Sequence, residues 1–350
     1  MDLAAIAFNI IHNVIKVKQN MTINLSAELH NGYDLDDPLV EIPLLEEFAL
    51  VVRKIQAFPI LDIASENLRK RVFSELSLNE LNMPNQYYEK WVSLADIFID
   101  FSWKSNPYFM DDMPLYYLSR YNISANELWH QIRKQSKKVV LMGLPTNALA
   151  TYYNLDYQAL NNSYLKAINI DYHELKKQSL IAENKFKKHD KCNLITEDRN
   201  LEVKFTITDT QMYNGDFGSR CFMVLPTGRI EKKIDSLDGI FYADKVYLDT
   251  KSYSDVQIIF EKGKIIATDF LNQNDDNIFL NKLLMNSLQE AYLTVGLNPA
   301  LTKNTGYLLF DECMLNNCCI RLQINNKTIS LANSKTKLYQ HNINILESET

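Results

Sequence analysis

The feature that most constrains the fold is the alternation of short apolar runs with helical stretches through roughly the first 190 residues. The runs have the length of strands, and we predict strands at residues 21–27, 60–63, 96–101 and 138–142. Helical patterns separate them, the clearest being residues 38–57. Helices between buried strands are typical of an α/β domain with a mainly parallel sheet and helices on both faces.

Helix-start signals follow two of these segments. Ser124 with Glu127 three residues later matches a capping box, which predicts a helix that begins at Ser124. Pro145 and Thr146 come directly after the strand at residues 138–142 and predict the start of another helix. A continuous helical stretch is predicted over residues 157–189.

The pattern changes near residue 190, where strands become frequent. Residues 201–207 alternate strictly between apolar and polar side chains, as a strand with one wet face does. Lys262 and Gly263 predict a tight turn between two further strands, and a helix is predicted over residues 277–289. The other predicted strands are residues 239–247, 256–260, 264–267, 307–310 and 319–324. This pattern predicts an α+β domain.

Length and charge set the broad class. At 350 residues we expect an α/β domain over residues 1–190 and an α+β domain over residues 191–350. The net charge of −6 argues against nucleic acid or an anionic membrane as the main partner. The N-terminus lacks the basic region of a signal peptide, and the sequence has no apolar run long enough to span a membrane. Five cysteines without metal-knuckle spacing favour reduced thiols, and we expect a cytoplasmic protein.

Three segments carry motifs that occur together, and in this order, in one known family. They are residues 144–150 with 167–172, residues 224–228 with 237–241, and residues 291–299 running on to Thr305–Gly306 and Asp311–Glu312. The segments read LPTNALA, VLPTG and AYLTVGLNP, and together they cover most of residues 140–325. They resemble the M29 family of metal-dependent aminopeptidases, the aminopeptidase T and S group.

The resemblance implies an α+β C-terminal domain like the M29 catalytic domain, a peptide substrate and a homodimer closed around a chamber. Family members hold two metal ions, zinc, cobalt or manganese, with two Glu, two His and an Asp, and a Tyr lies nearby. The ions activate a water molecule that attacks the peptide carbonyl.

The positions that match those ligands are substituted in this chain. Arg229 stands at the first Glu, Tyr292 at the second Glu and Cys319 at the first His. The Tyr position falls near Asn326, and His341 is the nearest candidate for the C-terminal His. Because a guanidinium is always charged and cannot ligate a cation, we expect the two-metal site to be lost and no cofactor to be bound.

A shifted metal site stays open as an alternative. It would use Glu231, Glu290, Cys319 and His341. Glu231 lies two residues after Arg229, so on an extended strand the two side chains share a face. Glu290 lies two residues before Tyr292, and on a helix an offset of two residues points elsewhere.

Other readings of the same residues stay open as well. Cys319 is either a nucleophile activated by His341 or a small apolar filler. Arg229 either binds a ligand carboxylate or phosphate or pairs with a glutamate, Glu231 or Glu290. The motif preserves Asp311 and Glu312, which are either ligand-binding groups or turn and strand-end residues without chemistry.

We therefore predict an M29 aminopeptidase-like protein without its metal pair, which binds a peptide or small molecule or has been repurposed. One alternative is an active metal-dependent aminopeptidase that removes N-terminal residues with a shifted site. The other is a non-metal enzyme that uses Cys319, His341 and Arg229.

Overall fold

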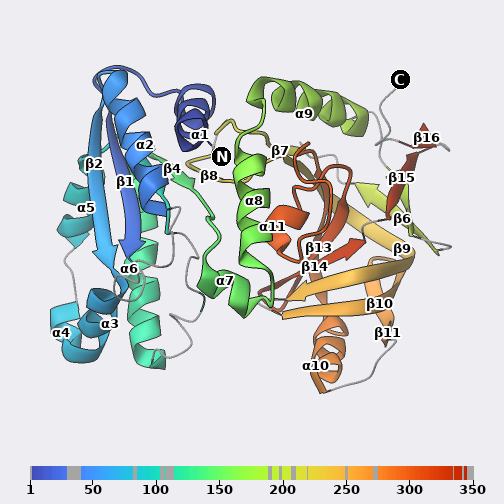
Figure 1. The fold of residues 1–350 in the computed structure, drawn as a ribbon. Coiled ribbons are helices and arrows are strands. Elements are labelled where there is room, and N and C mark those ends of the chain that lie inside the picture. Colours follow the sequence, from blue (N-terminus) through green and yellow to red (C-terminus); the bar gives the residue numbers. More distant parts are fainter. Residues whose placement is uncertain are drawn as a thin grey trace. The chain divides into compact units, whose positions relative to one another are not determined.

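The structure is a computed structural model in which packing divides the chain into two compact units (Figure 1). Unit 1 comprises Met1–Asn169 and Gly215–Pro226, and unit 2 comprises Ile170–Asn214 and Thr227–Thr350. The described residues are 2–29, 41–81, 85–102, 107, 114–187, 191–196, 199–205, 210–218, 220–248, 251–270, 275–333, 335–340 and 343–344. The domain boundary near residue 190, which rests on the change of strand pattern, stays a prediction.

Unit 1 contains a parallel sheet. Its strands are β1 (Thr22–Leu29), β2 (Phe58–Ser65), β3 (Ile97–Asp100), β4 (Lys138–Leu141) and β8 (Phe222–Val224). They pair in the order β2-β1-β3-β4-β8, and every neighbouring pair is parallel. The mainly parallel sheet predicted for the N-terminal domain is confirmed, and β8 joins it from a distant part of the chain.

Helices precede the first of these strands and lie between the others in sequence. They are α1 (Leu3–Asn9), the π-helix η1 (Ile10–Ile15), α2 (Glu41–Lys54), α3 (Glu66–Glu75), α4 (Leu78–Leu81), α5 (Asn85–Ser93), α6 (Leu115–Lys134), α7 (Asn147–Tyr152) and α8 (Tyr157–Ile168). On one face of the sheet, Phe98 and Val139 pack with Ile132 of α6. On the other face α2 packs on β1, and its Phe48 meets Phe101 edge to face at 5.1 Å between ring centroids.

The two predicted helix starts in this unit differ in outcome. Thr146 caps α7, since its hydroxyl accepts a hydrogen bond from the Leu149 amide at 3.0 Å, as predicted. The capping box at Ser124 is wrong, because Ser124 lies inside α6. That helix begins directly after Pro114, and helix-compatible residues run without a break from Leu115.

Unit 2 contains an antiparallel sheet with two longer helices, α9 (Tyr172–Lys187) and α10 (Asp275–Leu284), and the short helix α11 (Leu308–Asp311), in the described part of the chain. Its strands are β5 (Lys191–Thr196), β6 (Arg199–Phe205), β7 (Gln211–Tyr213), β9 (Arg229–Leu248), β10 (Lys251–Glu261), β11 (Lys264–Phe270), β12 (Leu288–Gly296), β13 (Cys318–Ile324), β14 (Lys327–Asn333), β15 (Lys337–Gln340) and β16 (Ile343–Asn344). The predicted α+β class of the C-terminal domain is confirmed.

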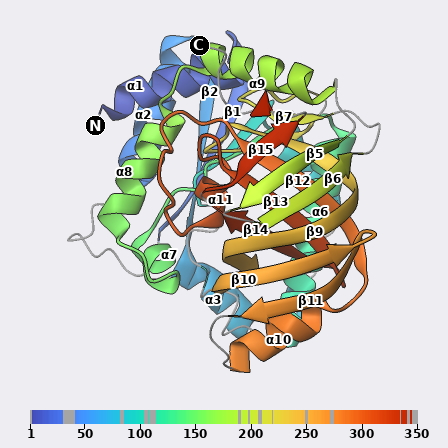
Figure 2. The same cartoon turned by 90° about the vertical axis from the view of Figure 1, so that its right-hand side faces the viewer.

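Strand β9 organises this sheet, because its 20 residues pair with different strands along its length. Its first part pairs with β7 and β12, its middle with β6, its second half with β10, and its end also with β14. Strand β13 pairs with β12 on one side and β14 on the other, and both of these also pair with β9. The run of strands β12, β13 and β14 therefore starts and ends at β9. Figure 2 shows the run from β5 and β6 through β9 to β10 and β11.

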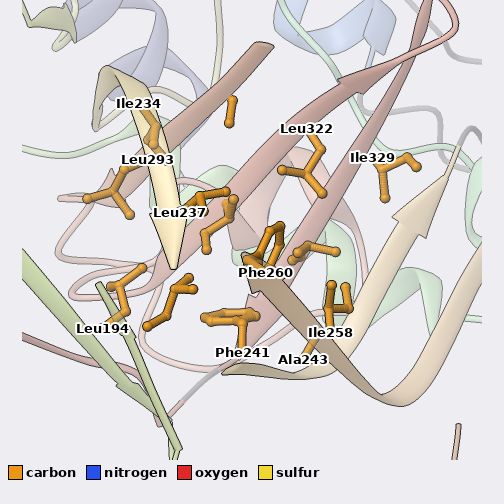
Figure 3. Close-up of a cluster of buried hydrophobic side chains, with 14 of the residues drawn as sticks. Leu194, Ile234, Leu237, Phe241, Ala243, Ile258, Phe260, Leu293, Leu322 and Ile329 are labelled. Atoms are coloured by element: carbon orange, nitrogen blue, oxygen red, sulfur yellow. The ribbon is translucent and has the colours of Figure 1, made fainter. Parts of the chain in front are cut away.

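The apolar core of unit 2 lies against one face of these strands. Phe241, Phe260 and Leu237 are buried at its centre (Figure 3). Leu293 of β12 and Leu322 of β13 point into the same core, so the residues that alternate with them point away from it. This alternation decides which side chains of β12 and β13 are available for a site.

The helix predicted over residues 277–289 is wrong in its second half. Helix α10 ends at Leu284, and β12 begins at Leu288, so Glu290 and Tyr292 lie on a strand. Residues 291–295 pair with β9 on one side and β13 on the other, and this tertiary pairing outweighs the local helical pattern.

Two other predicted elements differ from the structure. The stretch over residues 157–189 is two helices, because the Asp171 carboxylate accepts a hydrogen bond from the His173 amide at 2.8 Å and starts α9. The strand predicted at residues 307–310 is the helical turn α11. The described helices include none with the length and apolar character needed to cross a membrane.

Phe241→Ala tests the core of unit 2. Phe241 is fully buried, so we expect the free energy of unfolding to fall by about 3–5 kcal/mol. Phe279→Ala on α10 is the control, because Phe279 is 53% exposed and its loss leaves no cavity. Urea titration followed by circular dichroism measures both, and equal losses would contradict the core assignment.

Candidate functional site

Three neighbouring strands of unit 2 place the predicted site positions on one face. In the β9–β12 ladder, Arg229 lies opposite Gly296 and Lys233 lies opposite Tyr292. In the β12–β13 ladder, Cys319 lies opposite Thr294. Residues directly opposite each other in antiparallel strands share a face of the sheet. Arg229, Tyr292 and Cys319 therefore lie on the same face.

We call this surface the polar face. It comprises the side chains of β9, β12 and β13 that alternate with the core residues: Arg229, Glu231, Lys233, Tyr292, Thr294, Cys319 and Arg321. Polar groups on three adjacent strands lie within reach of one another, which is the arrangement that a binding or catalytic site needs.

The segment after β12 returns over the polar face. The Leu297 amide donates to the Gly228 carbonyl at 2.7 Å, and the Gly296 amide donates to the Asn317 carbonyl at 2.9 Å. A Cβ on Gly296 would lie 1.9 Å from the Met314 carbonyl oxygen, so only glycine permits this approach. The close approach brings the residues that follow α11, Glu312 first, onto β9 and β13.

Glu312 is the centre of a buried ionic cluster. Its two carboxylate oxygens each accept a hydrogen bond from Arg321 Nη2 at 2.8 Å, and Oε2 lies 3.7 Å from Arg229 Nη1. Arg321 Nη1 donates to Glu231 Oε2 at 2.7 Å. Ser330 donates to Glu312 Oε1 at 3.3 Å. We call Arg229, Glu231, Glu312 and Arg321 the Arg–Glu network.

The network is buried and balanced in charge. The side chains of Arg229 and Glu312 are 12% and 6% exposed, and those of Arg321 and Glu231 are 18% and 8% exposed. It contains two guanidinium groups and two carboxylates. Buried charges are tolerated when they are paired and hydrogen-bonded, and each member here meets a partner of opposite charge.

Electrostatics hold these groups in their charged forms. Burial is the largest single effect and lowers the pKa of Arg229, but its neighbours, Glu312 first, together outweigh burial and the pKa is raised overall. Burial is the largest single effect and raises the pKa of Glu312, but Arg229, Arg321 and the Ser330 hydrogen bond together outweigh burial and the pKa is lowered overall. At neutral pH Glu312 is therefore a carboxylate between two guanidinium groups.

Arg229 has two further neighbours besides Glu312. Its guanidinium carbon lies 4.5 Å from the centroid of the Tyr213 ring, a cation–π distance. Nη1 lies 3.8 Å from Cys313 Sγ. The sequence left pairing with Glu231 or Glu290 open for Arg229, and its closest carboxylate in the structure is that of Glu312. Glu231 is bonded instead to Arg321.

At the edge of the polar face, Lys233, Glu290 and Tyr292 form a second, partly exposed cluster. Glu290 accepts hydrogen bonds from Lys233 Nζ and, at 2.7 Å, from the Tyr292 hydroxyl. The Lys233 bond first, and the Tyr292 bond second, lower the pKa of Glu290. The same bond to Glu290 raises the pKa of Tyr292 to about 12. Glu290 and Tyr292 are two residues apart on a strand, so they share a face. On a helix their side chains would have pointed in different directions.

Asp311 is held by its own loop. Its carboxylate accepts from the Thr305 amide at 2.7 Å, the Gly306 amide at 3.0 Å and the Tyr247 hydroxyl at 2.8 Å. Burial raises the pKa of Asp311 despite these bonds. Such bonds close the turn before α11 and agree with the reading of Asp311 as a turn residue, whereas Glu312 faces the network.

Cys319 is fully buried against Tyr247 and Ala332. Asn317 Nδ2 lies 3.4 Å from its sulfur, and burial first, with Glu312 second, raises the pKa of the thiol well above its ordinary value. A buried thiol of raised pKa is a poor nucleophile. His341, the predicted partner of Cys319, lies outside the described residues.

The donor set of the polar face does not fit a pair of metal ions. Across the described ranges, no three His, Cys, Asp or Glu side chains are grouped so that they could hold a metal ion. Glu231 and Glu312 already accept hydrogen bonds from Arg321. A divalent ion beside Arg229 would meet a repulsion of about 8 kcal/mol at 4 Å and an effective dielectric constant of about 20.

The sequence pattern did not single out Arg321, which donates hydrogen bonds to both carboxylates of the network. A signal for it exists in β13. Cys318, Ile320 and Leu322 are apolar and buried, so the residues between them, Cys319 and Arg321, must share the opposite face.

The low pKa of Glu312 predicts an acid-dependent loss of stability. A folded pKa below the ordinary value of 4.5 means that the stabilisation is complete above that pH and is lost as the pH falls through the folded pKa. We expect Glu312→Gln to lower the melting temperature at pH 7, with a gap from the unsubstituted protein that narrows below about pH 4.5. Glu75→Gln, in an exposed pair with Arg71, is the control. A gap that stays constant down to pH 3 would contradict the assignment.

Known proteins resemble this chain in fold. No family model matches the chain, and no curated protein matches it. Among solved structures, wild-type AmpT from Thermus thermophilus has a TM-score of 0.59 and 13% identity, over 91% of this chain and 84% of that chain. The 2,5-dihydroxypyridine dioxygenase from Pseudomonas putida KT2440 has a TM-score of 0.57 and 10% identity, over 96% of this chain and 93% of that chain. The chain therefore has the fold of aminopeptidase T and resembles the M29 family in its fold.

Proposed function

We propose that this chain is an M29-like protein that works without the family's metal pair and binds a peptide or another small molecule on unit 2. The Arg–Glu network carries the proposal. Arg229 and Arg321 supply fixed positive charge beside the carboxylates of the polar face, Glu231 and Glu312. A metal would have to displace guanidinium groups that already satisfy those carboxylates.

The edge of the polar face supplies the groups that a ligand would meet. Lys233 and Glu290 are 39% and 42% exposed, and Tyr292 bonds Glu290. A cation, an anion and a phenol side by side suit a molecule with both an amine and a carboxylate, such as a short peptide.

A working metal-dependent aminopeptidase is the second candidate, and the likeness to aminopeptidase T favours it. Fold alone does not select it, because a dioxygenase shares the same fold and one fold hosts unrelated chemistry. As further expectations from the sequence and the resemblance, we propose that the protein is a cytoplasmic homodimer.

Metal analysis combined with an activity assay tests the proposal. We expect the purified protein to contain less than stoichiometric metal and to leave fluorogenic aminoacyl substrates uncleaved, with or without added zinc, cobalt or manganese. Calorimetry with short peptides of neutral, acidic and basic side chains should detect binding without turnover, and Lys233→Ala should weaken it.

Other outcomes point to the other candidates. Stoichiometric metal with turnover that a chelator abolishes would identify a metallopeptidase and overturn the proposal. Turnover that resists chelators and disappears in Cys319→Ala would identify a non-metal enzyme that uses Cys319. The Thr268→Val variant is the control, because Thr268 lies on β11, which pairs with β10 in the described sheet, and its hydroxyl bonds Asn281 of α10.

A further inference from the structure

The Arg–Glu network joins three separate parts of unit 2. Arg229 and Glu231 come from the start of β9, Arg321 from β13, and Glu312 from the turn that follows α11. Glu312 meets both strands, since it pairs with Arg321 at 2.8 Å and with Arg229 at 3.7 Å. Its side chain therefore fastens the returning segment to the polar face.

We propose that Arg229 and Arg321 are built-in cations that take the place of bound metal ions: they hold Glu312 and its segment on the polar face and keep metals out. This inference rests on the proposed function, which assumes that the metal pair is absent. Two guanidinium groups balance the two carboxylates, so a further divalent ion would add uncompensated positive charge.

The packing around the network shows why such cations are needed. Thr294 Oγ1 and Asn317 Oδ1 are buried beside it and have no hydrogen-bond partner among the residues that the structure describes. Buried polar atoms without partners oppose folding of this segment. The segment around Glu312 nevertheless lies tightly on Gly296, and the ion pairs of Glu312, together with the backbone hydrogen bonds at Gly296, offset this cost.

Single substitutions test whether the guanidinium groups carry this role. Removing one partner of a buried pair leaves an unpaired charge, so we expect Arg229→Met and Arg321→Met each to lower the melting temperature by about 6–20 °C. Arg71→Met is the matched control, because Arg71 forms an exposed pair with Glu75, and its shift should be under about 2 °C. Shifts of Arg229→Met and Arg321→Met as small as that of the control would overturn the inference.

A charge-preserving variant separates charge from shape. Arg229→Lys keeps the positive charge at the polar face but loses the planar fork. We expect its melting temperature to lie between those of the unsubstituted protein and Arg229→Met. A loss equal to that of Arg229→Met would show that packing, not charge, holds the segment, and would overturn the inference. This variant serves as the test where Arg229→Met does not fold.

Metal titration gives a second test, because the response of the melting temperature to metals would not depend on Arg229 if its role were purely structural. Zinc, cobalt and manganese should leave the melting temperature of the unsubstituted protein unchanged. Arg229→Glu replaces a cation with a carboxylate beside Glu231 and Glu312, so its melting temperature should rise by several degrees in the same metals. A rise in the unsubstituted protein, or none in Arg229→Glu, would overturn the inference.

The outcomes separate failure of the inference from failure of the proposed function. Chelator-sensitive peptidase activity of the unsubstituted protein would overturn the proposed function and the inference with it. Absence of that activity, together with an Arg229→Met variant as stable as Arg71→Met, would overturn the inference alone.

Discussion

The carboxylate of Glu312, held between Arg321 and Arg229, is the interaction on which the arrangement of unit 2 depends. With backbone hydrogen bonds at Gly296, it holds the segment after α11 beside β9 and β13. Gly296 permits the approach by lacking a Cβ, but a permitted approach supplies no attraction of its own. Attraction comes from the backbone hydrogen bonds of Gly296 with Asn316 and Asn317 and from the charges of the network, which act with little screening in a buried setting.

The fold of this chain therefore does not determine its chemistry. An aminopeptidase and a dioxygenase are both similar to it in fold, so the backbone arrangement alone is compatible with more than one reaction. The chemistry depends on the set of side chains on the polar face. Arg229 stands where the family resemblance places a metal-binding glutamate, and its charge reverses the electrostatics of that position.

Sequence reasoning succeeded where local pattern and packing agree. The apolar runs of β3 and β4 are buried on both sides in a parallel sheet, and their composition shows it. It failed at β12, because the neighbours that make Tyr292 part of a strand, β9 and β13, are remote in sequence. The pairing of Glu312 with Arg229 was equally out of reach, since it depends on the approach at Gly296.

Buried ion pairs contribute less to net stability than to the selection of one arrangement. Taking four charged groups out of water costs several kcal/mol for each, and their mutual attraction repays this only with good geometry. The short contacts of Arg321 to Glu231 and Glu312 meet that condition, whereas Arg229 lies farther from Glu312 and also uses the Tyr213 ring. Loss of one member should therefore be far more harmful than replacement of all four by well-packed apolar side chains. The network then acts mainly by penalising every arrangement in which one of its charges is buried alone.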